Sequence, residues 1–256
     1  MRLLAGALLL VLTVVLAVTP RDENSDQGPS LSESYGKMLK LVKLANFRRW
    51  ILLLLTCYVG LGPTLDLQDL QIVNSGVDYI SLGWIRSLSM PIKCLISLLS
   101  YRVSRSYPLH LWFYSLLLLQ IVFILITLLL NYFNHFDANL FIVAISFLLV
   151  VFECLKATLV VGVMSFHATI SEAKFGGLMM SIYAAFSNLG KTWPGTVSLF
   201  VMGRVGDYNI ICGVCSIFAL VWLVASKGTI DTFARPNFQL SPSDEHPNKA
   251  KSALLS

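Results

Sequence analysis

The sequence has very little charge for its length. Only 13% of its 256 residues are Asp, Glu, Lys or Arg, whereas soluble domains average roughly 25%. Hydrophobic residues make up 56% of the chain, and they stand in long continuous blocks without the alternating spacing of a β-strand. These features exclude a soluble enzyme and a membrane β-barrel. They predict an all-α membrane protein whose helices cross the bilayer several times.

Metal-binding and redox motifs are also missing. None of the four histidines has metal-ligand spacing, and the five cysteines lie in or beside apolar segments. Cys212 and Cys215 have CxxC spacing, but no second pair or histidine cluster completes a site, so we interpret them as small helix residues. The net charge of +5 needs no nucleic acid to explain it, because the basic residues occupy loops. We therefore expect no cofactor, no metal and no nucleic-acid partner.

Seven apolar segments approach the ~20 residues that a helix needs to cross the hydrocarbon core. They lie at about 3–19, 50–65, 80–100, 109–133, 140–166, 175–202 and 209–226. We divide the chain into a transmembrane or signal-like segment (1–19), a cytoplasmic linker (20–49), a six-helix unit (50–226) and a disordered cytoplasmic tail (227–256). Within the linker, residues 35–49 interleave apolar residues with lysines, which predicts a basic amphipathic helix on the membrane surface.

Loop charges predict the orientation in the membrane. Basic residues collect in the linker, in the loops at Arg102–Arg105 and Lys174, and in the tail, whereas only Arg2 and Arg204 face the other side. The basic side is therefore cytoplasmic, and the chain starts outside the cytosol and ends within it. Cleavage of 1–19 as a signal peptide would leave the basic linker outside, so we favour an uncleaved helix. Such a start is natural for a piece of a larger protein.

Small and polar residues form a stripe along the segment at 175–202. They recur at three- and four-residue steps, which places them on one face of a helix. The stripe comprises Gly177, Ser181, Ala184, Asn188, Thr192 and Gly195. In a membrane it would either let another helix approach closely or form one wall of a polar substrate path.

Five charged side chains fall inside the predicted spans, where charge is costly and each is a functional candidate. Glu153 and Lys156 are three residues apart, so a structural pair competes with a proton-coupling carboxylate beside a substrate-binding lysine. Arg86 and Lys93 lie toward span ends, where snorkelling is the alternative. Lys191 is deepest, and either contacts an anion or pairs with an acidic residue of another helix. The surplus of positive charge favours an anionic substrate.

The segment MSFHATISEAKFGGLMMSIYAAFSNLGKTWP, residues 164–194, resembles the signature of the acetyl-coenzyme A transporter family (solute carrier family 33) of the major facilitator superfamily. The residues that carry the resemblance are Met164, Phe166, Ser171, Glu172, Gly176, Gly177, Ser187, Asn188, Leu189, Gly190, Trp193 and Pro194. Weaker similarity extends back through Gly60, Gly76, Val77, Met90 and Pro91. Lys191 departs from the pattern, and the loop at 203–208 is shorter than in animal members.

The resemblance implies a twelve-helix fold in two lobes, of which this chain would form the last helix of the first lobe, the linker and the second lobe. Five helices of that fold have no counterpart here, so a missing amino-terminal lobe or a second copy of the chain would have to complete it. The implied function is transport of acetyl-coenzyme A from the cytosol into the endoplasmic reticulum lumen by alternating access, with no enzymatic step. The alternatives are transport of another anionic solute and a non-transporting membrane scaffold.

The resemblance also suggests roles for side chains near Lys191. Asn188 would hydrogen-bond the substrate or a neighbouring helix, and Trp193 and Tyr183 would stack on adenine or pack in the bundle. Pro194 should kink its helix, because it cannot donate to the backbone ladder. His167, Ser171 and Glu172 invite comparison with a hydrolase triad, but they lack the setting of a nucleophile elbow.

Overall fold

The computed structural model describes residues 36, 43–64, 67–132, 138–171 and 176–234, and every regular element within them is helical. The elements are α3 (Ala45–Thr56), the 3-10 segment η1 (Val59–Thr64), α4 (Leu67–Asn74), α5 (Tyr79–Ser104), α6 (Pro108–Asn131), α7 (Ala138–Ile170), α8 (Gly176–Val205) and α9 (Tyr208–Phe233). The predicted all-α class is confirmed. The segment at 3–19, most of the predicted amphipathic helix and the end of the tail lie outside the described residues.

Five helical segments of the described part are long and apolar enough to cross a membrane. They are Ala45–Asn74, Tyr79–Ser104, Pro108–Asn131, Asn139–Ile170 and Tyr208–Phe233. α8 is long enough at 30 residues, but its polar stripe makes it less apolar and it is not among the five. The chain is therefore a multi-pass membrane protein. The predicted spans at 80–100, 140–166 and 209–226 fall within α5, α7 and α9, and the span at 109–133 corresponds to α6, which ends two residues earlier at Asn131.

The predicted span at 50–65 differs from the structure, which divides this region into α3, η1 and α4. Gly60, Gly62 and Pro63 explain the break, because proline has no N–H for the helical ladder and glycine disfavours a helix. The two glycines also have no room for a side chain. A Cβ on Gly60 would meet Ala219 of α9, and one on Gly62 would meet the Pro194 carbonyl of α8. The break thus brings the η1 backbone directly against α8 and α9.

Three connections that the structure describes in full, before α5, before α6 and before α9, are short, and their chemistry fits their geometry. Gly76 and Gly206 adopt positive φ values of 94° and 70°, which glycine tolerates without strain. Asp207 caps α9 by accepting a hydrogen bond from the Asn209 backbone N–H at 2.8 Å. Pro108 begins α6, where its missing N–H would have had no helical partner. Each turn therefore reverses the chain within a few residues.

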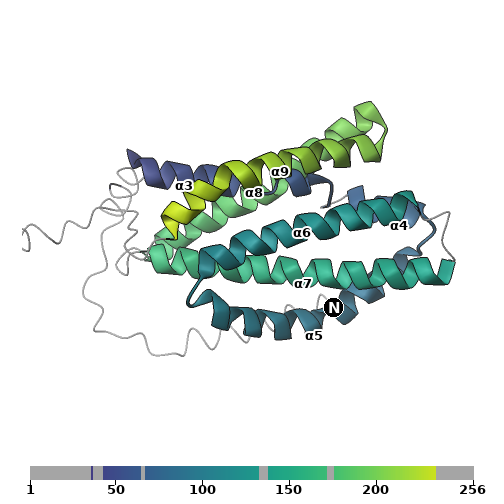
Figure 1. Cartoon of the computed structure of the whole chain (residues 1–256), viewed down its shortest axis with the longest axis horizontal. Helices are drawn as coiled ribbons and strands as arrows, with labels where there is room; N and C mark the ends of the chain where they lie inside the picture. The colour runs from purple at the N-terminus through teal and green to yellow at the C-terminus, as the bar shows by residue number, and fades with distance from the viewer. Residues whose placement is uncertain (1–35, 37–42, 65–66, 133–137, 172–175, 235–256) are drawn as a thin grey trace, which may run out of the picture.

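The helices form two groups that lie side by side (Figure 1). In one group α7 packs between α5 and α6, and in the other η1 packs between α8 and α9, with α3 alongside α8. The principal contact between the groups joins α6 to α9. The Gln120 amide of α6 donates to the Ser216 hydroxyl of α9 at 3.3 Å within that contact.

Buried aromatic side chains join the two groups at one end of the bundle. Trp50 of α3 is fully buried and contacts Trp112 of α6, Phe166 and His167 of α7, and Phe233 of α9 through its ring. We call this end of the bundle the Trp50 end and the opposite end, where α4 lies, the Asp69 end. Aromatic packing of this kind fixes ring orientations as well as burying apolar area. The Trp50 end is therefore held by rings from four helices.

Candidate functional site

The structure places the charged side chains of the predicted spans on three long helices. Arg86 and Lys93 lie on α5, Glu153 and Lys156 on α7, and Lys191 on α8. α5 and α7 are neighbours in one helix group, whereas α8 belongs to the other. The charges therefore come from both groups of the bundle.

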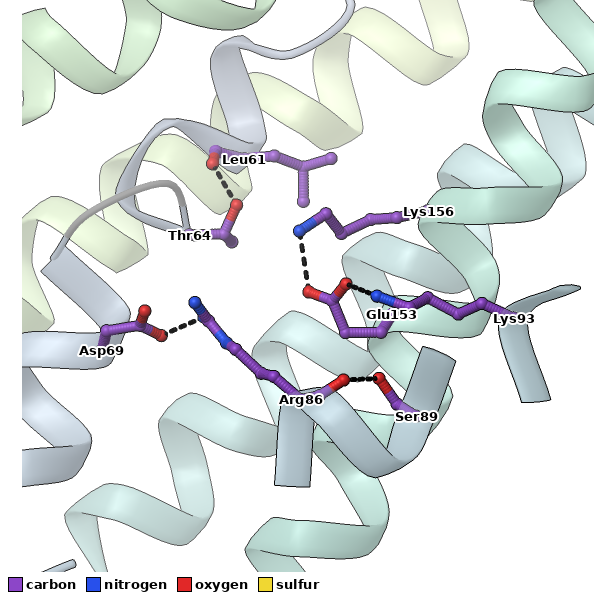
Figure 2. A network of polar contacts seen from close by, with 8 residues as sticks. All are labelled: Leu61, Thr64, Asp69, Arg86, Ser89, Lys93, Glu153 and Lys156. Carbon is purple, nitrogen blue, oxygen red and sulfur yellow. Dashed lines mark hydrogen bonds and ion pairs between the residues drawn. The ribbon is translucent and has the colours of Figure 1, made fainter. Parts of the chain in front are cut away.

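Glu153 is the centre of one network (Figure 2). Its Oε1 accepts a hydrogen bond from Lys156 Nζ at 2.8 Å, and its Oε2 accepts one from Lys93 Nζ at 3.0 Å. The pairing of Glu153 with Lys156 confirms what their three-residue spacing predicts. The pairing with Lys93 joins α7 to α5 and shows that Lys93 turns inward instead of snorkelling to the membrane surface.

Arg86 forms a second ion pair, with Asp69 of α4. In Figure 2, Arg86 and Lys156 point from α5 and α7 toward the side of the network where Thr64 and Asp69 lie. The Asp69 carboxylate thus sits beside the network. This pair connects the segment after η1 to α5, and it partly neutralises the guanidinium.

Lys191 of α8 stands apart from these pairs. Its ammonium lies over the Tyr58 ring, 5.7 Å from the ring centroid, which is a cation–π contact. Among the described residues no carboxylate pairs with it, which leaves the predicted alternative of an acidic partner unsupported there. Its charge is close enough to that of Lys156 for the two to interact. Lys191 is therefore the cation of the set whose charge has no counterion in the described part.

The combined cluster carries an excess of positive charge. Arg86, Lys93 and Lys156 share the two carboxylates Asp69 and Glu153, and Lys191 adds a fourth cation whose charge interacts with that of Lys156. We call these six residues the charged cluster. Unbalanced charge is costly in a medium of low polarity, and an anion bound between these side chains would offset that cost.

The signature residues Gly190 and Trp193 form the crossing of α8 over α3. A Cβ on Gly190 would meet the Leu54 carbonyl, so the two backbones are in contact there. Trp193 Nε1 donates to the Leu55 carbonyl oxygen at 2.8 Å, which satisfies an acceptor that the end of α3 leaves without a helical partner. The Trp193 ring stays 37% exposed, so one part of it is accessible beside the crossing. α8 continues through Pro194, whose predicted kink remains a prediction.

Most of the polar stripe faces away from the described helices. Gly177, Ser181, Asn188 and Thr192 are exposed, and Gly195 alone is buried among the stripe residues. The hydroxyls of Ser181 and Thr192 donate to carbonyls of their own helix four residues earlier, at 2.9 and 2.8 Å. The stripe is thus not a packing surface within the described bundle, and the Asn188 amide lies on its open face.

Other candidate residues lie inside the bundle. Tyr183 is fully buried at the Trp50 end and stacks on His167 with ring centroids 4.7 Å apart, so a ligand does not reach it in this conformation. Its contact with adenine stays a prediction. The Ser171 hydroxyl donates to the His167 backbone carbonyl at 2.7 Å and not to the imidazole, and Glu172 lies outside the described residues. This geometry gives no support to a hydrolase.

Metal chemistry finds no support in the described residues, where no group of three His, Cys, Asp or Glu could hold an ion. Sequence reasoning named Lys93 as a charged candidate but did not foresee its pairing with Glu153, or that of Asp69 with Arg86, because both partners lie on other elements. No local spacing signals these contacts, since Lys93 is 60 residues from Glu153 and Asp69 is 17 residues from Arg86.

Comparison with known proteins adds one finding. A family model described as "Acetyl-coenzyme A transporter 1" matches residues 86–215, a little more than half of the chain. The matched range begins at Arg86 on α5 and ends at Cys215 on α9, so it contains the whole charged cluster except Asp69, as well as the α8 side of the crossing over α3. No solved structure matched the chain.

Proposed function

Because the chain belongs to the acetyl-coenzyme A transporter 1 family, we propose that it carries acetyl-coenzyme A from the cytosol into the endoplasmic reticulum lumen. The observation that supports this proposal most is the charged cluster, an excess of cations placed among membrane-crossing helices. Coenzyme A carries several phosphate charges, and a phosphate enters a medium of low polarity only with cationic partners. Such a transporter makes and breaks no covalent bond, so the proposal includes no enzymatic activity.

The substrate contacts that we propose lie on α5, α7 and α8. Lys191, Lys156 and Arg86 would bind phosphate oxygens, because each is a cation with at least part of its surface accessible. Asn188 would hydrogen-bond the substrate from the open face of α8. The exposed part of the Trp193 ring would stack on adenine. Tyr183 could join these contacts only after a rearrangement that uncovers it.

Glu153 is our candidate for proton coupling. Protonation would remove the carboxylate charge that holds Lys156 and would free its ammonium group for an anion. A proton and an anion would then load the site together, which lowers the charge that crosses the membrane. In this proposal Glu153 has two roles. Its charge neutralises the lysines while no substrate is bound, and its protonation couples proton movement to substrate binding.

A second lobe would complete the pathway in our proposal. A major facilitator path lies between two lobes that rock against each other in alternating access. The polar stripe on the open face of α8 supplies a wall for such a path, which the described helices leave uncovered. The partner would be an amino-terminal lobe or a second copy of this chain.

Uptake of labelled acetyl-coenzyme A into vesicles that contain the full chain tests the proposal. Lys191→Gln should lower the uptake efficiency about tenfold or more, because it removes a charge-assisted contact to phosphate. Lys227→Gln on α9, an exposed lysine outside the charged cluster, is the matched control and should leave uptake unchanged. An imposed proton gradient should speed uptake by the native chain but not by Glu153→Gln.

The rival functions give different results in the same vesicles. Free coenzyme A should compete with the labelled substrate, and a lack of competition would indicate transport of another anionic solute. If neither uptake nor binding of acetyl-coenzyme A occurs and Lys191→Gln changes nothing, the chain is a membrane scaffold and the proposed function is wrong.

A further inference from the structure

We propose that the two lysines of Glu153 have unequal roles: Lys93 is a fixed positioning residue, and Lys156 is an exchangeable cation that leaves Glu153 to bind a phosphate group. This inference rests on the proposed function, because it describes how the same site accepts an anion. It assigns a role to Lys93 that its sequence position does not suggest, and it names phosphate as the group that Lys156 recognises.

The two ion pairs differ in how deeply they are buried. The Lys93 side chain is 18% exposed and the Glu153 side chain 14%, so their contact is shielded on both sides. The Lys156 side chain is 42% exposed, although its ammonium lies as close to the carboxylate as that of Lys93. Solvent access weakens an ion pair and gives a competing ligand room to approach. Lys156 is therefore the partner that an incoming anion reaches first.

Lys93 is fixed because α5 is held to α7 along its length. Further along both helices from the Lys93–Glu153 pair, the Ser100 hydroxyl of α5 and the Thr158 hydroxyl of α7 lie 3.1 Å apart. One to two turns further, the Ser165 hydroxyl donates to Ser104 at 2.9 Å. The sequence separations across these three contacts are 60, 58 and 61 residues, so the helices run parallel in a nearly constant register. These polar contacts keep α5 in register on α7, so the base of the Lys93 side chain stays opposite Glu153.

Lys156 is held by fewer constraints. It lies on the same helix as Glu153, so the loss of its ion pair separates no helices. Its ammonium is also 5.5 Å from the centroid of the Phe152 ring on that helix, which supports the side chain without binding it to another element. In Figure 2 the ammonium points past Glu153 toward Thr64 on η1, the side of the cluster where Arg86 ends. A swing toward a ligand there changes only side-chain torsions.

Two lysines on one carboxylate make this exchange possible. If Glu153 had a single lysine, loss of that lysine would leave a buried carboxylate without a counterion, which is strongly unfavourable. Because Lys93 stays in place, Glu153 remains paired while Lys156 turns to the phosphate. A phosphate dianion also attracts an ammonium group more strongly than a single carboxylate does, so the exchange favours phosphate-bearing solutes.

Substitutions of Lys93, Lys156 and Glu153 have distinct expected effects on the uptake of acetyl-coenzyme A. Lys156→Gln should raise KM about tenfold or more, and Glu153→Gln should lower KM because Lys156 loses its competitor. Lys93→Gln should raise KM, because Glu153 then depends on Lys156 alone and holds it. Adding Glu153→Gln to Lys93→Gln should restore a low KM, whereas adding it to Lys156→Gln should not. A purely structural role for Lys93 would lower kcat or the amount of folded protein without this restoration.

Lysine acylation followed by mass spectrometry provides a readout that does not depend on acetyl-coenzyme A. In the native chain, a membrane-permeant amine-reactive reagent should modify Lys156 faster than Lys93, and inorganic pyrophosphate should protect Lys156 and leave the Lys227 rate unchanged. If pyrophosphate protects Lys156 but acetyl-coenzyme A is not taken up, the proposed function is wrong and the exchange stands. Equal modification of both lysines, or no restoration in the Lys93→Gln and Glu153→Gln double variant, would overturn the exchange.

Discussion

Gly190 shows how a single residue sets the distance between two membrane helices. Its missing side chain lets α8 contact the α3 backbone at Leu54, and three residues later Trp193 donates to Leu55 across the same crossing. Small residues serve this purpose in membranes, where close packing contributes what the hydrophobic effect cannot. The signature that links the chain to its family therefore contains a structural element, besides the residues that we propose as substrate contacts.

We expect Gly190→Ala to destabilise the protein by about 1–3 kcal/mol, because its Cβ would overlap a backbone carbonyl that has no room to move. Gly203→Ala on the same helix is the control, since nothing lies within 4 Å of the point that its Cβ would occupy and alanine favours a helix over glycine. It should leave stability unchanged or raise it slightly. Thermal unfolding in detergent measures both variants, and an equal loss in the two would contradict this account of the crossing.

The charged residues show what spacing along the chain predicts and what it does not. Glu153 and Lys156 are three apart on a helix, so their contact follows from helical geometry. Lys93 and Asp69 reach their partners only because α5 lies beside α7 and α4 lies beside α5, and nothing in the local sequence encodes those neighbours. The burial of Tyr183 against His167 could not be predicted from the sequence either, because an apolar helix does not reveal which aromatic side chain faces inward.

At the scale of elements, α5 depends on α7 for most of its packing. Its outward side chains, including Trp84, Leu88 and Leu98, are exposed in the bundle, as expected for a helix that faces lipid or a partner. Its contacts with α7 include the polar pairs at Ser100 and Ser104. We therefore expect α5 and α7 to move as one unit.

Disulfide crosslinking tests this unit directly. A Ser104→Cys and Ser165→Cys double variant should crosslink on mild oxidation, because the two hydroxyls lie 2.9 Å apart, and it should keep its uptake. Leu99→Cys with Ser165→Cys is the control, because Leu99 lies on the exposed face of α5 and should not crosslink. Loss of uptake on crosslinking the first pair would mean that α5 slides on α7 during transport.

The helices themselves were largely predictable, because long apolar runs leave few alternatives in a membrane. The region of 45–74 was not, since Gly60, Gly62 and Pro63 stop the helix at a point where hydropathy alone continues it. The reason for the break lies in α8 and α9, which the η1 backbone contacts through those glycines. The sequence of residues 45–74 alone does not reveal these contacts with α8 and α9.

At the scale of the whole molecule, the two ends of the bundle differ in charge. Exposed arginines at the Trp50 end include Arg48, Arg49, Arg102 and Arg105, whereas the Asp69 end has the exposed Asp78 and Asp207 beside Arg204. We infer from the charge rule that the Trp50 end faces the cytosol. In that orientation, the aromatic contacts would lie toward the cytosol and the Asp69–Arg86 pair toward the lumen.

Cysteine accessibility in sealed microsomes checks this orientation. Ser106→Cys, in the turn between α5 and α6, should react with a membrane-impermeant maleimide from the cytosolic side, above the level of the native chain. Asn74→Cys at the opposite end should react only after the membrane is permeabilised. The reverse pattern would invert the topology and with it the direction of transport that we propose.

The break between α3 and η1 also has a consequence for synthesis of the chain. The Leu55 carbonyl and the Thr56 hydroxyl accept hydrogen bonds from Trp193 of α8 and Trp222 of α9, which are 138 and 166 residues further along. Backbone groups without partners are costly in lipid, so this early segment cannot be fully satisfied while the later helices are still being translated. The final position of this segment therefore depends on α8 and α9, the last two helices of the described part.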